Sequence, residues 1–281
     1  MMTKTREFDL NGIKAGASNS PIVACEILTN IPSNYPELLK KAWGETIYNL
    51  VECVKAAEKL GFSLLCIRFN GENIDESKEC LKEILAVTDL PLILTGSFRR
   101  DFDAQLLPEL ARIAGRKCTI GAVEEENHKA IAPIINECGH NIIARTPIDI
   151  NLTKQLNILL TEIGFSPDRI LIDPNTGGLG YGLDYAYSII ERIKLAGAGG
   201  DVMLNMPIIT FVGEEAWKTK EAKSEAVPQE WGDFNTRAIT WECITASSML
   251  TSGANIVVMR HPEAIKNIDK FINNFKPHLQ A

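Results

Sequence analysis

Residues 141–173 read NIIARTPIDINLTKQLNILLTEIGFSPDRILID, and this stretch decides the fold of the chain. It begins and ends with apolar runs, 141–145 and 169–173, which lack the polar alternation of a half-exposed strand. Such runs are typical of strands that are buried on both faces. The segment between them has one apolar face at helical spacing, made of Leu152, Leu156, Leu159 and Ile163. The stretch is therefore predicted to be a strand–helix–strand unit.

The same unit repeats in both directions along the chain. Short runs rich in Ile, Val and Leu predict eight strands, at 21–28, 64–69, 91–95, 118–122, 141–145, 169–173, 206–212 and 255–260. Amphipathic helical runs separate them, and this alternation is typical of a parallel sheet. We therefore predict an α/β fold, a single (β/α)8 TIM barrel over residues 21–281, preceded by an N-terminal segment, 1–20. In such barrels the carboxyl ends of the strands and the loops after them carry function.

The composition narrows the class of protein. A length of 281 residues is ordinary for one such barrel. The formal net charge of −7 argues against a nucleic-acid partner, which usually requires a basic patch. The apolar runs are too short to span a bilayer, and residues 1–7 do not resemble a signal peptide. We therefore expect a cytoplasmic protein whose partners include neither nucleic acid nor a membrane.

The cysteines are distributed mostly one to each predicted element. They are Cys25, Cys53, Cys66, Cys80, Cys118, Cys138 and Cys243. Because no C-x-x-C spacing occurs, the pattern favours buried thiols in a reducing cell over metal ligands. His261 is the only histidine at the carboxyl end of a predicted strand, and one histidine makes neither a metal site nor a catalytic triad. We expect no metal site and no iron–sulfur cluster in this chain.

The longest predicted connection, residues 213–235, follows the seventh strand. Loops of this length inside a compact domain are usually functional. It contains Glu214 and two tryptophans, Trp217 and Trp231. The tryptophans are either anchors of an interface, where large aromatic side chains carry much of the binding energy, or rings that pin the loop to the barrel. The sequence leaves both interpretations open.

A glycine-rich turn follows the sixth predicted strand and reads DPNTGGLGYG, residues 173–182. Such turns present backbone N–H groups and can hold an anion. This one lacks the lysine of a P-loop and the spacing of a dinucleotide fingerprint. It therefore indicates a loop whose backbone approaches a large flat ligand more than it indicates a phosphate site.

Two arginines, Arg68 and Arg145, stand at the ends of predicted strands. We expect them to form structural ion pairs with nearby carboxylates such as Glu26 or Asp173. No nucleophile elbow, H-E-x-x-H zinc motif or convergent acid–base pair is present. We therefore assign no catalytic residue.

Several longer runs resemble a known family. They include EENHK at 125–129, IARTPIDINLTKQLNILL at 143–160, LGYGL at 179–183, MPII at 206–209, KEAK at 220–223, EWG at 230–232 and VMRHP at 258–262. Together these runs are similar to the small subunit of the corrinoid iron–sulfur protein, also called the delta subunit of the acetyl-CoA decarbonylase/synthase complex. The resemblance extends over nearly the whole chain from about Pro21 and is densest from Glu124 onward.

The resemblance implies a partner and a cofactor. The family's small subunit is a barrel that forms a heterodimer with a large (gamma) subunit, and cobalamin lies between the two. Its cobalt accepts a methyl group from methyltetrahydrofolate, or from a methanopterin relative, through a methyltransferase, and delivers it to acetyl-CoA synthase. The small subunit carries neither the iron–sulfur cluster nor a cobalt ligand, so the resemblance implies a non-catalytic subunit.

We accordingly place the cofactor-facing surface after the sixth and seventh predicted strands. The residues proposed to face the corrin ring are Asn175, Thr176, Gly177, Asn205, Met206 and Glu214. None of them is expected to bind cobalt or to transfer a proton.

Two other functions remain open from the sequence. The first is a free-standing pterin-dependent methyltransferase of the same fold, in which Asp173, Asn175 and Asn205 would bind the pterin at the barrel mouth. The second is a barrel enzyme that acts on a small metabolite, which would need a convergent acid–base pair.

Overall fold

The computed structural model describes residues 4–175, 177 and 182–279, and it describes side chains as far as residue 274. In this part of the chain the main sheet has 8 strands, all parallel to their neighbours, in the order β8-β7-β6-β5-β4-β3-β10-β9. They are β3 (Ile22–Leu28), β4 (Leu65–Arg68), β5 (Leu92–Thr95), β6 (Thr119–Val123), β7 (Asn141–Arg145), β8 (Ile170–Asp173), β9 (Ile209–Thr210) and β10 (Ile256–Met259). A parallel bridge between Ile172 and Ile208 joins the two ends of this order. The predicted (β/α)8 barrel is confirmed.

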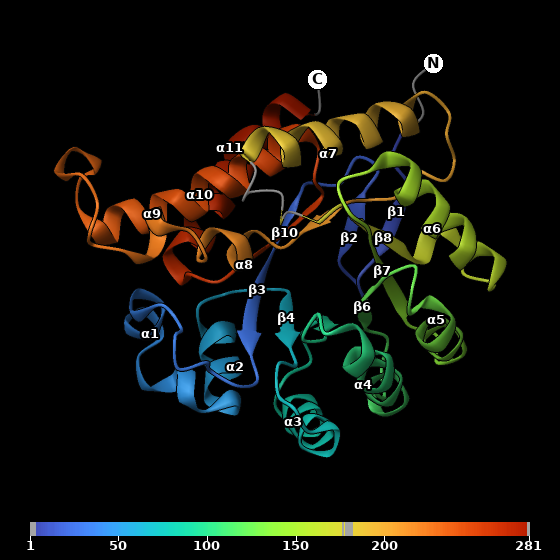
Figure 1. Cartoon of the computed structure of the whole chain (residues 1–281), viewed down its shortest axis with the longest axis horizontal. Helices are drawn as coiled ribbons and strands as arrows, with labels where there is room; N and C mark the ends of the chain where they lie inside the picture. The colour runs from blue at the N-terminus through green and yellow to red at the C-terminus, as the bar shows by residue number, and fades with distance from the viewer. Residues whose placement is uncertain (1–3, 176, 178–181, 280–281) are drawn as a thin grey trace.

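Helices surround the strands, with α3 on one side of the barrel and α7 and α11 on the other (Figure 1). The helices after β3 to β6 are α1 (Glu37–Trp43), α2 (Leu50–Lys59), α3 (Ile74–Val87), α4 (Arg100–Ile113) and α5 (His128–Glu137). Those after β7 to β10 are α6 (Ile150–Glu162), α7 (Leu183–Ala198), α8 (Val212–Ala216), α9 (Lys220–Lys223), α10 (Phe234–Ser252) and α11 (Pro262–Leu279). Short 3-10 turns add η1 (Gly44–Tyr48), η2 (Pro167–Arg169) and η4 (Gln229–Trp231).

Helix α6 shows how the sequence sets these elements. Its N-cap, Asp149, accepts the backbone N–H groups of Asn151 at 2.7 Å and Leu152 at 3.0 Å, which satisfies two donors that have no partner within the helix. Leu156 and Leu160 are buried one turn apart and pack the helix on the sheet. Of the predicted face, Leu156 alone is buried, whereas Leu152 is 36% exposed and Leu159 and Ile163 are half-buried. The face that packs is therefore rotated from the predicted one.

A hairpin that the sequence analysis did not foresee closes the amino end of the barrel. Strands β1 (Glu7–Asp9) and β2 (Lys14–Gly16) pair antiparallel, and Phe8, with none of its surface exposed, packs among residues of the barrel interior. Asp9 holds the hairpin in place, since its backbone oxygen accepts the Asn141 amide at 2.8 Å. Strands of three residues with charged side chains carry too little hydrophobic pattern to be recognised in sequence.

Most predicted strands agree with the structure to within two residues, but the seventh is much shorter than predicted. The predicted strand 206–212 contains only β9, two residues long, and Val212 already begins α8. The run is apolar throughout because Phe211 and Val212 are buried in the turn and the helix as deeply as they would be in a strand. Hydrophobicity therefore did not mark where the strand ends.

Candidate functional site

Charged side chains from several strands meet inside the barrel at its carboxyl end. We call them the mouth network: Glu26, Arg68, Arg145, Asp173, Glu214 and Arg260. Arg68 Nη2 lies 2.5 Å from Glu26 Oε1 and 2.9 Å from Glu214 Oε2. Arg145 Nε lies 2.6 Å from Asp173 Oδ2, and Arg260 Nε donates to the second oxygen of Glu26. The two expected pairs, Arg68 with Glu26 and Arg145 with Asp173, are confirmed.

The network balances three guanidinium groups with three carboxylates. Burial opposes ionisation of Glu26, but the neighbouring Arg260 and Arg68 outweigh it and lower its pKa. Burial likewise opposes ionisation of Glu214, yet the Arg68 guanidinium and the Lys218 ammonium lower the pKa of Glu214 to about 2. Both carboxyl groups are therefore ionised at neutral pH. The mouth compensates its own charges and needs no ligand to neutralise them.

Two phenylalanines enclose the guanidinium groups of the mouth. The ring centre of Phe98 lies 3.5 Å from Cζ of Arg145 and 4.1 Å from Cζ of Arg68. Phe211 contacts the same arginines at 5.1 and 5.5 Å and meets Phe98 edge to face at 5.7 Å. The half-buried Phe98 has a backbone φ of 62°, a conformation that residues other than glycine rarely adopt. Buried side chains thus fill the mouth, and Phe98 covers them.

Helix α10 supports the mouth from behind through Glu242, which is fully buried. Burial raises the pKa of Glu242 to about 7, although the backbone N–H groups of Arg260 and His261 donate to its oxygens at 2.6 and 3.1 Å and oppose this rise. His261 is also buried, and its Nδ1 accepts the backbone N–H of Glu263 at 3.2 Å. These contacts make both residues structural supports and leave His261 poorly placed as a metal ligand.

The two tryptophans of the long loop have different environments. The ring of Trp217 is only 2% exposed and stacks on His261, with 5.9 Å between ring centres and 18° between planes. The interpretation of Trp217 as an interface anchor is therefore wrong, because the ring pins α8 to the barrel. Trp231, in η4, is 42% exposed and stays available to a partner.

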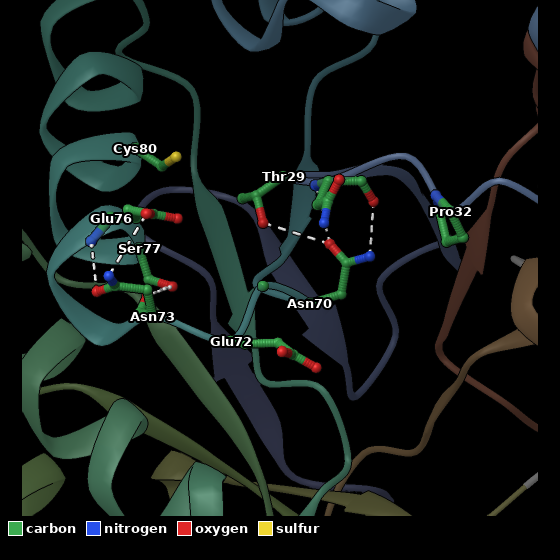
Figure 2. Close-up of a pocket in the computed structure, with 10 residues that line it drawn as sticks. Thr29, Pro32, Asn70, Glu72, Asn73, Glu76, Ser77 and Cys80 are labelled. Carbon is green, nitrogen blue, oxygen red and sulfur yellow. Dashed lines mark hydrogen bonds between the residues drawn. The ribbon is translucent and has the colours of Figure 1, made fainter.

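A polar hollow of about 740 Å³ opens beside the mouth, after β3 and β4 (Figure 2). Asn70 joins the two loops there: its Oδ1 accepts the backbone N–H of Asn30 at 2.9 Å, and its Nδ2 donates to the Asn30 oxygen at 2.6 Å. Thr29 points toward Asn70, while Asn73 caps the start of α3 (Figure 2). The side-chain amides of Asn70 and Asn73 thus bond mainly to neighbouring backbone groups.

A smaller hollow of about 190 Å³ lies across the mouth, after β6, β7 and β8. We call it the glutamate hollow, and its lining residues are Arg100, Glu124, Glu125, Glu126, Arg145, Thr146, Pro147, Leu152 and Asn175. Arg145 therefore belongs both to the mouth network and to this hollow. Asn175, with φ of 57°, donates its backbone N–H to Asp173 Oδ1 at 3.0 Å and accepts the Gly177 N–H at 3.0 Å through its own Oδ1.

The structure separates the six proposed corrin-facing residues. Asn175, Gly177 and Glu214 lie at the carboxyl end of the barrel, whereas Thr176 lies outside the described residues.

The placement of Asn205 and Met206 at the mouth is wrong, because both precede β9 and lie at its amino end. The backbone oxygen of Asn205 accepts the Arg6 N–H at 2.8 Å, and its side-chain amide donates to the Lys4 oxygen at 2.9 Å. Met206 is fully buried.

Neither a cluster of metal-binding side chains nor a membrane-spanning helix is found in the part of the chain that the structure describes. Among residues 4–175, 177 and 182–279, no group of three or more His, Cys, Asp and Glu side chains is arranged to hold a metal ion. No helix within these residues is long and apolar enough to cross a bilayer.

Comparison with known proteins gives the family. Residues 18–270 match the family described as CO dehydrogenase/acetyl-CoA synthase delta subunit. The chain belongs to this delta-subunit family. The resemblance seen in the sequence runs is therefore confirmed over most of the chain.

Two similar members of the delta-subunit family come from archaea. The acetyl-CoA decarbonylase/synthase complex subunit delta of Methanopyrus kandleri is 27% identical over 258 residues, which cover 88% of this chain and 64% of that protein. The Archaeoglobus fulgidus subunit delta is 32% identical over 206 residues, which cover 70% of this chain and 45% of that protein. The chain thus spans 45–64% of the length of these relatives.

Solved structures similar to this delta-subunit family member include dihydropteroate synthases. The enzyme from Stenotrophomonas maltophilia superposes with a TM-score of 0.66 at 14% identity, covering 97% of this chain and 98% of that chain. A Yersinia pestis dihydropteroate synthase with a pterine-sulfa conjugate has a TM-score of 0.64 at 13% identity, covering 97% and 99%. At such identities the likeness supports the barrel fold alone.

Proposed function

We propose that this chain is the small (delta) subunit of a corrinoid iron–sulfur protein and helps a large (gamma) subunit to hold cobalamin. Membership of the delta-subunit family supports this role. The proposed chain of transfer runs from methyltetrahydrofolate, or a methanopterin relative, through a methyltransferase to the corrinoid protein and on to acetyl-CoA synthase, in the cytoplasm. The same carrier serves acetyl-CoA synthesis and cleavage.

The filled barrel mouth is the observation that carries the proposal. Pockets that take a small substrate are usually lined mainly by apolar side chains and are open before the ligand binds, whereas the hollow of about 740 Å³ beside this mouth is polar. Here Arg68 and Arg145 occupy the mouth, with their charges balanced and with Phe98 above them. The top of the barrel therefore offers a surface flanked by polar hollows, which suits a broad, flat cofactor held mainly by a partner.

The residues at this surface fit a shielding role toward a corrin. When bound, the cobalamin would supply the cobalt that carries the methyl group. From this chain, Asn175 and Gly177 offer amide and backbone groups after β8, and Glu214 stays paired with Arg68 in the mouth. His261 is buried and engaged, so it does not act as a cobalt ligand. The proposed role of these residues is to contact the corrin and to exclude water, without catalysing a step.

The alternative function, a free-standing pterin-dependent methyltransferase, fits the site less well. Asp173, one of its three proposed pterin ligands, already accepts from Arg145 and from the Asn175 backbone. Asn205 lies at the opposite end of the barrel, bonded to the N-terminal segment. A pterin in the mouth would have to displace Phe98 and break the Arg145–Asp173 pair.

Two titrations test the proposal against this alternative. The full chain alone and the chain reconstituted with its large subunit are each titrated anaerobically with cobalamin and with methyltetrahydrofolate or its methanopterin relative. We expect cobalamin to bind the pair and no saturable pterin binding to the chain alone. Stoichiometric pterin binding by the chain alone, followed by methyl transfer to free cobalamin, would establish the methyltransferase instead.

A further inference from the structure

The glutamate hollow is small, polar and adjacent to the covered mouth. Its volume is about 190 Å³, whereas one water molecule occupies about 30 Å³ in the liquid. It therefore admits a side chain of several non-hydrogen atoms, and the much larger corrin ring stays outside. We infer that this hollow receives one propionamide side chain of the corrin ring. The inference rests on the proposed function and adds to it the chemical group that the hollow recognises.

The hollow offers hydrogen-bond donors from Arg145 and Asn175. Arg145 is 8% exposed, and within the described residues only its Nε has a hydrogen-bond partner, Asp173. Phe98 covers one face of the Arg145 guanidinium. The terminal N–H groups of Arg145 point outward in the guanidinium plane, so the ring does not block them. Asn175 accepts the Gly177 N–H through its Oδ1, and its side-chain NH2 has no bonded partner among the described residues, so this group can donate to a ligand. A carbonyl oxygen in the hollow would accept from these groups.

The opposite wall offers hydrogen-bond acceptors. Glu124, Glu125 and Glu126 all line the hollow. Arg100 is shared between two of them, at 3.5 Å from Glu124 and 3.1 Å from Glu126, and Gln155 donates to Glu125 at 2.9 Å. Each carboxylate accepts several hydrogen bonds, so these contacts leave acceptor capacity for an NH2 group.

The balance of charge selects among possible ligands. Three glutamates face Arg100 and Arg145, and Arg145 is already neutralised by Asp173. The hollow is therefore net negative, and a phosphate or carboxylate would meet repulsion. A neutral group that both accepts and donates matches the two walls, and a carboxamide is such a group. Pro147 and Leu152 supply apolar contact for a methylene stem.

The length of the side chain follows from the position of the ring. Phe98 covers the mouth and keeps the ring above the barrel, so a group that enters the hollow must extend away from the ring plane. A propionamide, with two methylene groups, reaches further than an acetamide. The same carboxamide chemistry is also offered by an Asn or Gln side chain of the large subunit, and the experiment separates the two sources.

The test uses the reconstituted pair loaded with cobalamin or with each of the three cobalamin monocarboxylates, in which one propionamide is hydrolysed to a carboxylate. Retention is measured as the rate of corrinoid loss on dilution. We expect one monocarboxylate to dissociate at least about tenfold faster than the other two, because its carboxylate faces the glutamates. Glu125→Gln, which removes one of these charges, should reduce that gap at least about threefold.

A matched control removes an exposed charge at the far end of α5, the helix that follows the three glutamates. Glu137→Gln, at the last residue of α5, should leave the gap unchanged. Equal retention of the three monocarboxylates, or a gap that both Glu125→Gln and Glu124→Gln leave intact, overturns the inference. In either case tight binding of cobalamin itself would leave the proposed function standing, whereas failure of the pair to retain cobalamin contradicts the proposed function.

Discussion

The guanidinium carbon of Arg145 lies 3.5 Å from the ring centre of Phe98 while its Nε lies 2.6 Å from Asp173. The ring contact orients the guanidinium plane, and the carboxylate neutralises its charge. Arg145 belongs both to the mouth network and to the glutamate hollow. A ring above and a carboxylate beside it make this arginine a structural part of the mouth. Changes in Phe98 should therefore alter stability and the upper surface together.

Replacing Phe98 tests the cover of the mouth. Phe98→Ala removes cation–π contacts with two arginines, each worth roughly 0.5–2 kcal/mol, and should lower the free energy of unfolding by about 2 kcal/mol. Phe98→Gly should be more stable than Phe98→Ala by about 1 kcal/mol, because glycine relieves the strain at φ of 62°. Urea unfolding measures both variants. A glycine variant less stable than the alanine variant would contradict this backbone conformation.

Replacing Glu26 tests the balance of buried charge. Glu26→Gln leaves Arg68 and Arg260 without their shared carboxylate and should cost about 3–5 kcal/mol of unfolding free energy. The matched control is Glu52→Gln, which removes an exposed pair with Lys55 and should cost about 0–1 kcal/mol. Similar costs for the two variants in urea unfolding would refute the role assigned to the mouth network.

Glu242 should give the protein a recognisable pH dependence. Burial raises its pKa from 4.5 to about 7. Between these values the folded chain keeps a proton that the unfolded chain has released, so the free energy of unfolding falls as the pH rises through this window. At about 1.4 kcal/mol for each pKa unit, the wild type should lose roughly 3 kcal/mol relative to Glu242→Gln, which does not titrate. Parallel denaturation curves from pH 4.5 to 8 should show this difference, and two profiles of equal slope would argue against it.

The two tryptophans of the long loop should respond differently to truncation. Trp217→Ala removes a buried ring from His261 and should cost about 3–5 kcal/mol of stability. Trp231→Ala removes a ring that is 42% exposed and should leave stability nearly unchanged. If Trp231 anchors the large subunit, its loss should weaken association by about 2 kcal/mol, roughly 30-fold in Kd. An unchanged Kd would leave Trp231 without a role in the interface.

The barrel was predictable because each strand is buried on both faces and each helix on one. These constraints produce two different hydrophobic patterns in the sequence: continuous apolar runs for the strands and one apolar face at helical spacing for the helices, as in residues 141–173. The pairs Arg68–Glu26 and Arg145–Asp173 were also predictable, since neighbouring parallel strands bring their carboxyl ends to one edge. What failed was the placement of Asn205 and Met206 at the mouth, since both stand at the amino end of the predicted strand 206–212 as well as of β9.

The rest of the site depends on tertiary contacts that have no local signal. The position of Phe98 over two arginines follows from a left-handed backbone that its side chain does not favour. Glu214 reaches Arg68 only because α8 begins directly after β9 and turns back over the mouth. The hairpin that carries Phe8 becomes apparent only from its packing against the amino end of the barrel. Sequence patterns indicate which residues are buried, but not which segments meet.

The most direct test of the central claim is the affinity for cobalamin of the large subunit alone and of the large subunit paired with this chain. Both are measured anaerobically by equilibrium titration, after assembly of the pair has been verified by its mass. If this chain helps to hold the corrinoid, the pair should bind cobalamin at least about tenfold more tightly, a gain of about 1.4 kcal/mol. Equal dissociation constants in a verified pair would contradict the claim.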